Sequence, residues 1–145
     1  MLLGTYPAKF VAGHRVAVPL ILRKNLGEKF ILARWYEDCL VLIDINRWQD
    51  LYKRLGGENN LIITPIRDTE RFILASAFEV MPDDQGRIVV PEMLIKYSDL
   101  SEDIYFVGLG DKVEIWNKSN WEAREAEIIK NASSYIDELS NKQNG

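Results

Sequence analysis

The stretch Arg15-Val16-Ala17-Val18-Pro19 returns 72 positions later as Arg87-Ile88-Val89-Val90-Pro91, so an arginine, three apolar residues and a proline occur twice. A second landmark also repeats. Residues 40–48 carry a Leu-x-Leu-Ile run followed by Trp, and residues 113–121 carry Val-x-Ile-Trp followed by Trp, at a shift of 73. Two landmarks at nearly one offset indicate an internal duplication. A duplicated unit can pack against its own copy about a pseudo-twofold axis, and the chain then presents the same surface twice.

Turn and capping residues divide each copy into the same series of elements. We place the first repeat at residues 5–47, followed by a helix to about residue 57, and the second at 76–119, followed by a C-terminal helix. In the first repeat we expect strands at Tyr6–Phe10, Val16–Val18, Lys29–Arg34 and Cys39–Asp44, a short helix from Pro19 to Leu26, and a helix capped by Asp44.

The second repeat should follow the same plan after a linker. The linker holds a loop at Glu58-Asn59-Asn60 and a helix from Thr64 to about Leu74. We then expect strands at Ala77–Met81, Arg87–Val90, Ile104–Gly108 and Lys112–Trp116, a short helix from Pro91, and a last helix opened by a capping box at Ser119–Glu122. The fold class is therefore α+β: two interleaved hairpin units with helices outside, and Trp48 and Trp121 half-buried in equivalent places.

Composition excludes several classes of protein. The chain has 145 residues, of which 47% are hydrophobic and 28% charged, which is typical of a globular protein. The longest apolar run, Val16 to Leu22, is too short to span a bilayer, and the first residues lack the pattern of a signal peptide. Cys39 is the only cysteine, which excludes an internal disulfide and favours a reducing compartment. We expect a cytoplasmic protein without membrane contact.

The charge is unevenly distributed. The net charge is −4, yet residues 1–27 carry Lys9, Arg15, Arg23 and Lys24 and no acidic residue. A local basic face can hold a polyanion on an acidic protein, because salt limits the reach of each charge to about 8–10 Å. The alternative is chance clustering of lysine and arginine on a solvated face.

The sequence does not predict an enzyme. Asp83 and Asp84 are adjacent, so their carboxylates diverge, whereas an acid–base pair must converge on one substrate. His14 has no visible catalytic partner, and Cys39 lies in an apolar strand where burial is the default. With one Cys and one His, a zinc site of the usual ligands is excluded. We expect no catalytic residue, metal, cofactor or small-molecule substrate.

The repeated turn is the best candidate for a binding site. Asp83-x-x-x-Arg87 spans a tight turn, where the aspartate can accept hydrogen bonds from turn amides or pair with Arg87. In the first copy Arg15 holds the matching place, but Val11 stands where the acid would be. Arg15 is thereby freer to meet a phosphate or a guanine edge. The alternative is that both arginines only hold their turns.

These motifs resemble the MraZ family, which is built from two AbrB/SpoVT-type swapped-hairpin repeats. The resemblance covers nearly the whole chain. Its marks are Gly4-Thr5-Tyr6, the run from Arg15 to Pro19, Cys39-Leu40-Val41-Leu42 before Trp48, the run from Asp83 to Pro91, and the run from Val107 to Trp116. The resemblance implies a pseudo-twofold β-barrel core.

The resemblance also implies a function. Members are bacterial transcription regulators that act on a cell-division and cell-wall gene cluster, bind repeated promoter sites in double-stranded DNA and assemble into rings, and two Asp-x-x-x-Arg turns are the DNA-contacting signature. We therefore expect a nucleoid-associated DNA-binding protein with Arg15, Arg87, Lys9, His14, Asp83 and Gln85 in its site. The first turn departs from the signature, since Val11-Ala12-Gly13-His14 lacks the acid and displaces the glycine; His14 could compensate by donating to a phosphate.

Two other functions are compatible with the same fold: an antitoxin-like protein that binds a protein partner, and a structural ring-former. We also expect self-association, because the linker and C-terminal helices carry the apolar residues Phe72, Ile73, Trp121, Ile128 and Ile129. The alternative is that these side chains fold back onto their own sheet.

Overall fold

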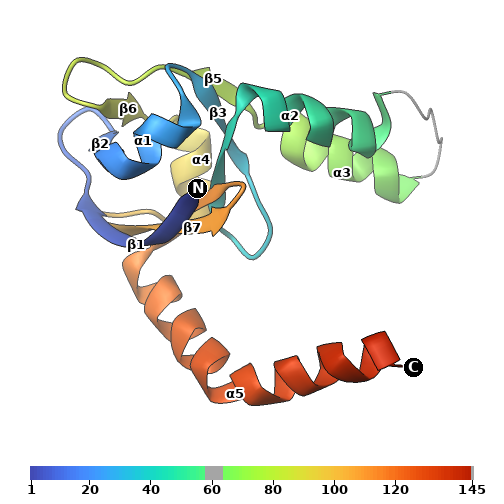
Figure 1. Ribbon diagram of the computed structural model, residues 1–145. Coiled ribbons are helices and arrows are strands. Elements are labelled where there is room, and N and C mark those ends of the chain that lie inside the picture. The colour runs from blue at the N-terminus through green and yellow to red at the C-terminus, as the bar shows by residue number, and fades with distance from the viewer. Residues whose placement is uncertain (58–63, 145) are drawn as a thin grey trace.

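The computed structural model describes residues 1–57 and 64–144 and has a mixed α+β fold (Figure 1). The expected loop at Glu58-Asn59-Asn60 lies outside the described residues. The strands are β1 (Leu2–Lys9), β2 (Arg15–Ala17), β3 (Phe30–Arg34), β4 (Leu40–Asp44), β5 (Phe78–Val80), β6 (Arg87–Val89), β7 (Asp103–Gly110) and β8 (Val113–Asn117). The helices are α1 (Leu20–Leu26), α2 (Ile45–Tyr52), the π-helical turn η1 (Lys53–Gly57), α3 (Thr64–Leu74), α4 (Glu92–Ser98) and α5 (Lys118–Asn144).

Strand pairing crosses between the two halves of the chain. Six antiparallel strands form one sheet in the order β1-β7-β8-β4-β3-β5, and β2 pairs with β6 in a separate two-stranded ribbon. The first strand of each half therefore pairs with the third strand of the other half, β1 with β7 and β5 with β3. In the described chain the sheet is open, with β1 and β5 at its edges. The α+β prediction is confirmed, whereas the closed barrel is wrong: β1 and β5 do not pair.

The register in the middle of the sheet follows the offset seen in the sequence. Leu40 lies opposite Ile115, and Leu42 lies opposite Val113. Residues 73 positions apart are equivalent in the two repeats, so Leu40 corresponds to Val113 and Leu42 to Ile115. The pair Leu40–Ile115 is therefore equivalent to the pair Val113–Leu42. The ribbon behaves in the same way, since Arg15 lies opposite Val89 and Arg87 lies opposite Ala17. Equivalent residues of the two halves thus have equivalent partners.

The main core lies between one face of the sheet and the layer formed by the ribbon, α1 and α4. Alternate strand residues point to it, as the period of two in a β-strand requires. It draws large fully buried side chains from both halves, including Phe30, Leu32 and Leu42 from the first and Ile88, Phe106 and Ile115 from the second. One core therefore joins the halves, as a unit of this size needs.

The opposite face of the sheet carries two smaller clusters. Trp48 of α2 packs with Ile43 under α3, and Trp121 of α5 packs on Trp116, with ring centroids 5.6 Å apart. Both tryptophans are half-buried against the predicted strands, β4 and β8, which confirms that part of the prediction. They pack on the face opposite Leu42 and Ile115, whose side chains belong to the main core.

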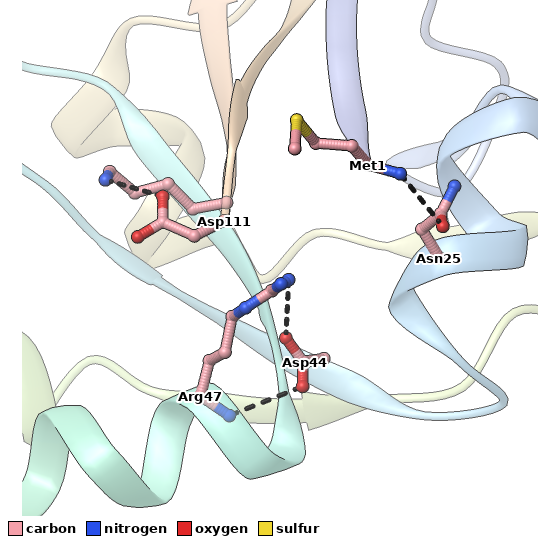
Figure 2. Close-up of polar contacts among 6 residues, drawn as sticks. Met1, Asn25, Asp44, Arg47 and Asp111 are labelled. Atoms are coloured by element: carbon pink, nitrogen blue, oxygen red, sulfur yellow. Dashed lines mark hydrogen bonds and ion pairs between the residues drawn. The ribbon is translucent and has the colours of Figure 1, made fainter.

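The helix ends follow the capping residues in most cases. The Asp44 side chain accepts a hydrogen bond from the Arg47 amide and pairs with the Arg47 guanidinium, so it caps α2 as expected (Figure 2). The predicted capping box at Ser119 is wrong. Asn117 Oδ1 accepts from the amides of Ser119 and Asn120 at 2.8 and 3.2 Å, and α5 already begins at Lys118. Asparagine competes well with serine for this position because its oxygen reaches the same amides.

The two peripheral helices differ in how they bury their apolar residues. Ile73 of α3 is fully buried, and Phe72 stacks with Tyr36 and meets Tyr97 edge-on, so this helix folds back onto its own sheet. Phe72 and Ile73 are therefore not the exposed patch that the sequence suggested. In contrast, α5 leaves the body of the molecule (Figure 1) and exposes Ile128, Ile129, Tyr135, Ile136 and Leu139. Among the described helices none is long and apolar enough to cross a membrane.

Candidate nucleic-acid interface

The two-stranded ribbon of β2 and β6 brings both repeated arginines onto one face. Val16 lies opposite Ile88, and both side chains are buried in the core. Because successive strand residues alternate between faces, Arg15 and Arg87 point to the other, solvent-facing side. Arg15 lies opposite Val89 and Arg87 lies opposite Ala17, so the two arginines occupy diagonal positions on this face of the ribbon. Figure 1 shows that the loops leading into β2 and β6 lie on the same side of the molecule, away from α2 and α3.

The ribbon is locked at both ends by matching hydrogen bonds. The Val18 amide donates to the Gly86 carbonyl, and the Val90 amide donates to the His14 carbonyl, each at 2.9 Å. Each turn is therefore tied to the strand of the other half. The ribbon thereby couples the two arginine-bearing turns.

The turn before Arg87 is organised by the carboxylate of Asp83. Asp83 Oδ1 accepts from the amides of Gln85 at 2.9 Å and Arg87 at 3.0 Å. The Asp83 amide in turn donates to the Arg87 carbonyl at 2.9 Å. The aspartate thus bonds to turn amides rather than forming an ion pair with the Arg87 side chain. The sequence left two roles open for Asp83, bonding to turn amides or pairing with Arg87, and the structure shows the bonds to the amides.

The turn before Arg15 keeps the backbone bond without the acid. The Val11 amide donates to the Arg15 carbonyl at 2.8 Å, as Asp83 does to Arg87. Two successive residues have positive φ here, Gly13 at 83° and His14 at 57°, whereas the second turn has only Gly86, at 77°. A histidine in the left-handed region costs conformational energy that glycine does not. The departure seen in the sequence therefore changes the turn conformation but keeps its closing bond.

The hydrogen bonds from the turn lower the pKa of the Asp83 carboxyl below its ordinary value. The Arg87 amide is the largest cause, and the Gln85 amide and the charges of Arg87 and Arg15 act in the same direction. Hydrogen bonds to the ionised form favour that form.

A titration of Asp83 should show this shift. Because the folded pKa is lowered, the bonds stabilise the turn above the unfolded pKa of about 3.9 and are lost as the pH falls through the folded value. Carbon-13 NMR should give a midpoint below about 3.9, with the Gln85 and Arg87 amide shifts following the same curve. In Asp83→Asn these amides should lose that transition. A midpoint at or above the ordinary value would contradict the arrangement.

The other predicted site residues lie in different surroundings. His14 and Gln85 are exposed in the two turns, flanking the arginines as expected. Lys9 lies at the end of β1, where its Nζ is 3.7 Å from Asp103 and 3.9 Å from Glu102. Two carboxylates thus compete with any phosphate for Lys9, which the sequence did not reveal because both acids are distant in the chain.

Arg23 is a further basic residue at this site that the prediction did not include. Its Nε donates to the Val18 carbonyl at 2.8 Å, and its guanidinium lies directly against Gly86: a Cβ added there would be 2.6 Å from Nε. Arg23 and Lys24 of α1 also line a hollow of about 510 Å³ beside the second turn, together with Met81 and Asp83. The basic composition of residues 1–27 was the available signal for Arg23.

The arrangement offers no nucleophile at Cys39. This thiol is fully buried, and burial, followed by the nearby charge of Glu114, raises its pKa. A thiol that stays protonated in an apolar site is inert. In the described part of the chain, no group of three or more His, Cys, Asp or Glu side chains could hold a metal ion.

Comparison with known proteins identifies relatives along the whole chain. Residues 73–142 match the family described as "MraZ protein, putative antitoxin-like". Proteins named "Transcriptional regulator MraZ" are similar over nearly the full length. That of Acetivibrio thermocellus is 35% identical over 142 residues, covering 97% of each chain. That of Bifidobacterium longum is 34% identical over 96% of this chain and 92% of its own, and that of Leuconostoc citreum is 35% identical over 90% and 91%. These relatives are named as regulators, not as enzymes.

Proposed function

This chain belongs to the MraZ family, and from that premise we propose that it regulates transcription by binding specific sequences in double-stranded DNA. The observation that supports this most directly is the solvent-facing side of the ribbon, where Arg15 and Arg87 sit on a diagonal. The proposed target is the promoter of a cell-division and cell-wall gene cluster, as the sequence resemblance implied. Acting there would place the protein at the nucleoid in the cytoplasm.

A two-stranded ribbon with these side chains suits the major groove. That groove of B-DNA admits a two-stranded β-ribbon, and arginine can bind guanine O6 and N7 with two hydrogen bonds. The small apolar residues between the arginines, Ala17 and Val89, are exposed and could contact thymine methyl groups. In the described chain neither arginine forms an ion pair with an acidic side chain, so both guanidinium groups remain able to bind.

The small number of basic groups argues for binding by several chains at once. The net charge is −4, and the acid-free segment supplies few cations. Each phosphate contact adds about 0.9 to the magnitude of the salt slope. One chain would therefore bind weakly, and linked chains on spaced repeats would gain affinity through effective concentration.

Replacing Arg15 or Arg87 with alanine should weaken binding to the DNA immediately upstream of the gene for this chain. Where the lost contact is to a phosphate, we expect the loss to shrink as salt rises, because fewer counterions are then released on binding. Gel-shift binding at several salt concentrations measures this. Lys142→Ala, in the last turn of α5, is the control and should bind as the parent does. Full affinity in both arginine variants, with the fold intact, would overturn the proposal.

The main rival is an antitoxin-like role, which the family description also names. A stoichiometric small protein recovered in a pull-down, with no retention of DNA, would favour that role over the proposed one. A purely structural ring-former would retain neither.

We include self-association in the proposal. The chain would consist of two swapped-hairpin repeats, 5–47 and 76–119, and successive chains would meet in a closed ring through the exposed apolar residues of α5, among them Ile129 and Ile136. Light scattering at micromolar concentration should give a multiple of 16.7 kDa. Ile129→Lys should lower that mass. A parent mass near that of one chain would rule the ring out.

A further inference from the structure

The two arginine-bearing turns are held with unequal firmness. The second turn has two fixed supports: Asp83, which accepts from two turn amides, and the Arg23 guanidinium, which lies against Gly86. The first turn has neither. Val11 replaces the acid, and the position 72 residues after Arg23 is Ile95, an apolar residue packed against the core.

The two arginine side chains also differ. Arg15 folds back over its own turn, where its Nε donates to the Ala12 carbonyl at 2.9 Å and lies 3.5 Å from the place of an added Cβ on Gly13. Arg87 makes no side-chain hydrogen bond or ion pair with the described residues. A guanidinium with all its donors available can present its full two-pronged face to a guanine, and because the backbone beneath Arg87 is already fixed by other groups, little backbone freedom is lost on binding.

The charge of each turn points the same way. The second turn carries Asp83 and Asp84, both exposed, and these carboxylates repel phosphates. Within the major groove the same groups can accept from cytosine N4. The first turn, residues 11–15, contains no acid and carries the positive charge of Arg15. The first turn therefore favours phosphate contact, whereas at the second turn the two carboxylates offset the charges of Arg87 and of the adjacent Arg23.

We infer that the two halves divide the work: the second turn reads bases through Arg87, the first turn binds phosphate through Arg15, and Arg23 positions the second turn. This inference rests on the proposed DNA binding and assigns unequal roles within it. The symmetric alternative gives both arginines the same role.

Four variants separate these roles when each binds two DNA fragments over a range of salt. The fragments are the DNA upstream of the gene for this chain and the same base composition in shuffled order. Arg87→Ala should lower the preference for the first fragment by about 5- to 150-fold, with little loss on the shuffled one. Arg15→Ala should weaken both fragments equally and lower the salt slope by about 0.9 for each bound chain. Arg15→Lys should recover most of this binding, whereas Arg87→Lys should not recover the preference, because lysine lacks the two-pronged geometry.

Arg23 has its own test. Arg23→Lys keeps the charge but removes the planar group that lies against Gly86. It should lower the sequence preference in the manner of Arg87→Ala while leaving the salt slope unchanged. Circular dichroism checks that the fold is intact. Lys24→Ala is the neighbouring control, expected to affect the salt slope and not the preference.

The outcomes distinguish the two proposals. A parent chain that binds both fragments equally overturns sequence-specific binding itself. A parent that discriminates, with Arg15→Ala and Arg87→Ala lowering the preference alike, overturns the division of roles and leaves the proposed function standing. An unchanged preference in Arg23→Lys overturns the positioning role of Arg23.

Discussion

Replacing Phe106 with alanine should lower the free energy of unfolding by about 3–5 kcal/mol, as expected for loss of a large aromatic side chain from a packed core. Phe106 is fully buried in β7, with Tyr6 of β1 on one side and Ile115 of β8 on the other. The sites around it come from both halves of the chain, so relaxation into the cavity is limited. Urea unfolding followed by tryptophan fluorescence measures the change.

The same experiment tests whether the halves share one core. Because the main cluster contains Leu32 and Leu42 as well as Phe106, the variant should unfold in a single transition that includes the first half. Leu109→Ala on the same strand is the control: Leu109 is 47% exposed, so its loss should cost much less. Two separated transitions in Phe106→Ala would contradict a common core.

The repeated stretches predicted more of the sheet than element propensities alone could. The two offsets, 72 for the arginine stretch and 73 for the tryptophan one, reappear in the registers of β2 with β6 and β4 with β8. When a repeated sequence packs on its own copy about a twofold axis, two equivalent residues have equivalent pairing partners. The offset between the repeats therefore predicts which strands pair and in which register. The alternation of buried residues then decides which face meets the core.

Other parts of the fold depend on contacts between distant segments. Nothing near Leu2 marks the start of a strand, yet β1 begins there because it pairs with residues up to Gly110. An open sheet and a closed barrel need the same strands and differ only in whether the edges meet, which local patterns do not encode. At α5 the choice between Asn117 and Ser119 as the cap was decided by the end of β8.

In the candidate site, too, some features were predictable from the sequence and others depend on contacts between distant segments. Arg15 and Arg87 were expected in one site, and the pairing of β2 with β6 places both on the solvent-facing side of the ribbon. Arg23 was missed because its role needs the Gly86 backbone to come within contact distance of α1. Lys9 was placed in the site from the sequence, but its ion-pair partners Glu102 and Asp103 lie more than 90 positions away and were not foreseen.

Replacing Gly108 with alanine should destabilise the protein by about 2–3 kcal/mol, the upper part of the range for overpacking. A Cβ at this position would lie 2.8 Å from the Leu2 carbonyl carbon and oxygen and from the Leu3 nitrogen. These are backbone atoms of the paired strand β1, so they cannot turn aside as a flexible side chain could. The strand must move instead. Since β1 is one of the strands that pair the first half with the second, amide exchange should accelerate along Leu2–Lys9.

Gly110→Ala separates this clash from the general cost of removing a glycine. Gly110 has a φ of 94°, but nothing lies within 4 Å of an added Cβ. Its replacement should therefore cost about 1 kcal/mol of backbone strain and leave exchange in β1 unchanged. Both glycines lie in β7 opposite β1, two residues apart, but only at Gly108 would the added Cβ meet β1 backbone. If β1 amides stayed equally protected in both variants, the close packing of β1 on β7 would not be what holds the halves together at this edge. Faster exchange in Gly108→Ala alone would locate that role in the backbone contact between Gly108 and Leu2–Leu3.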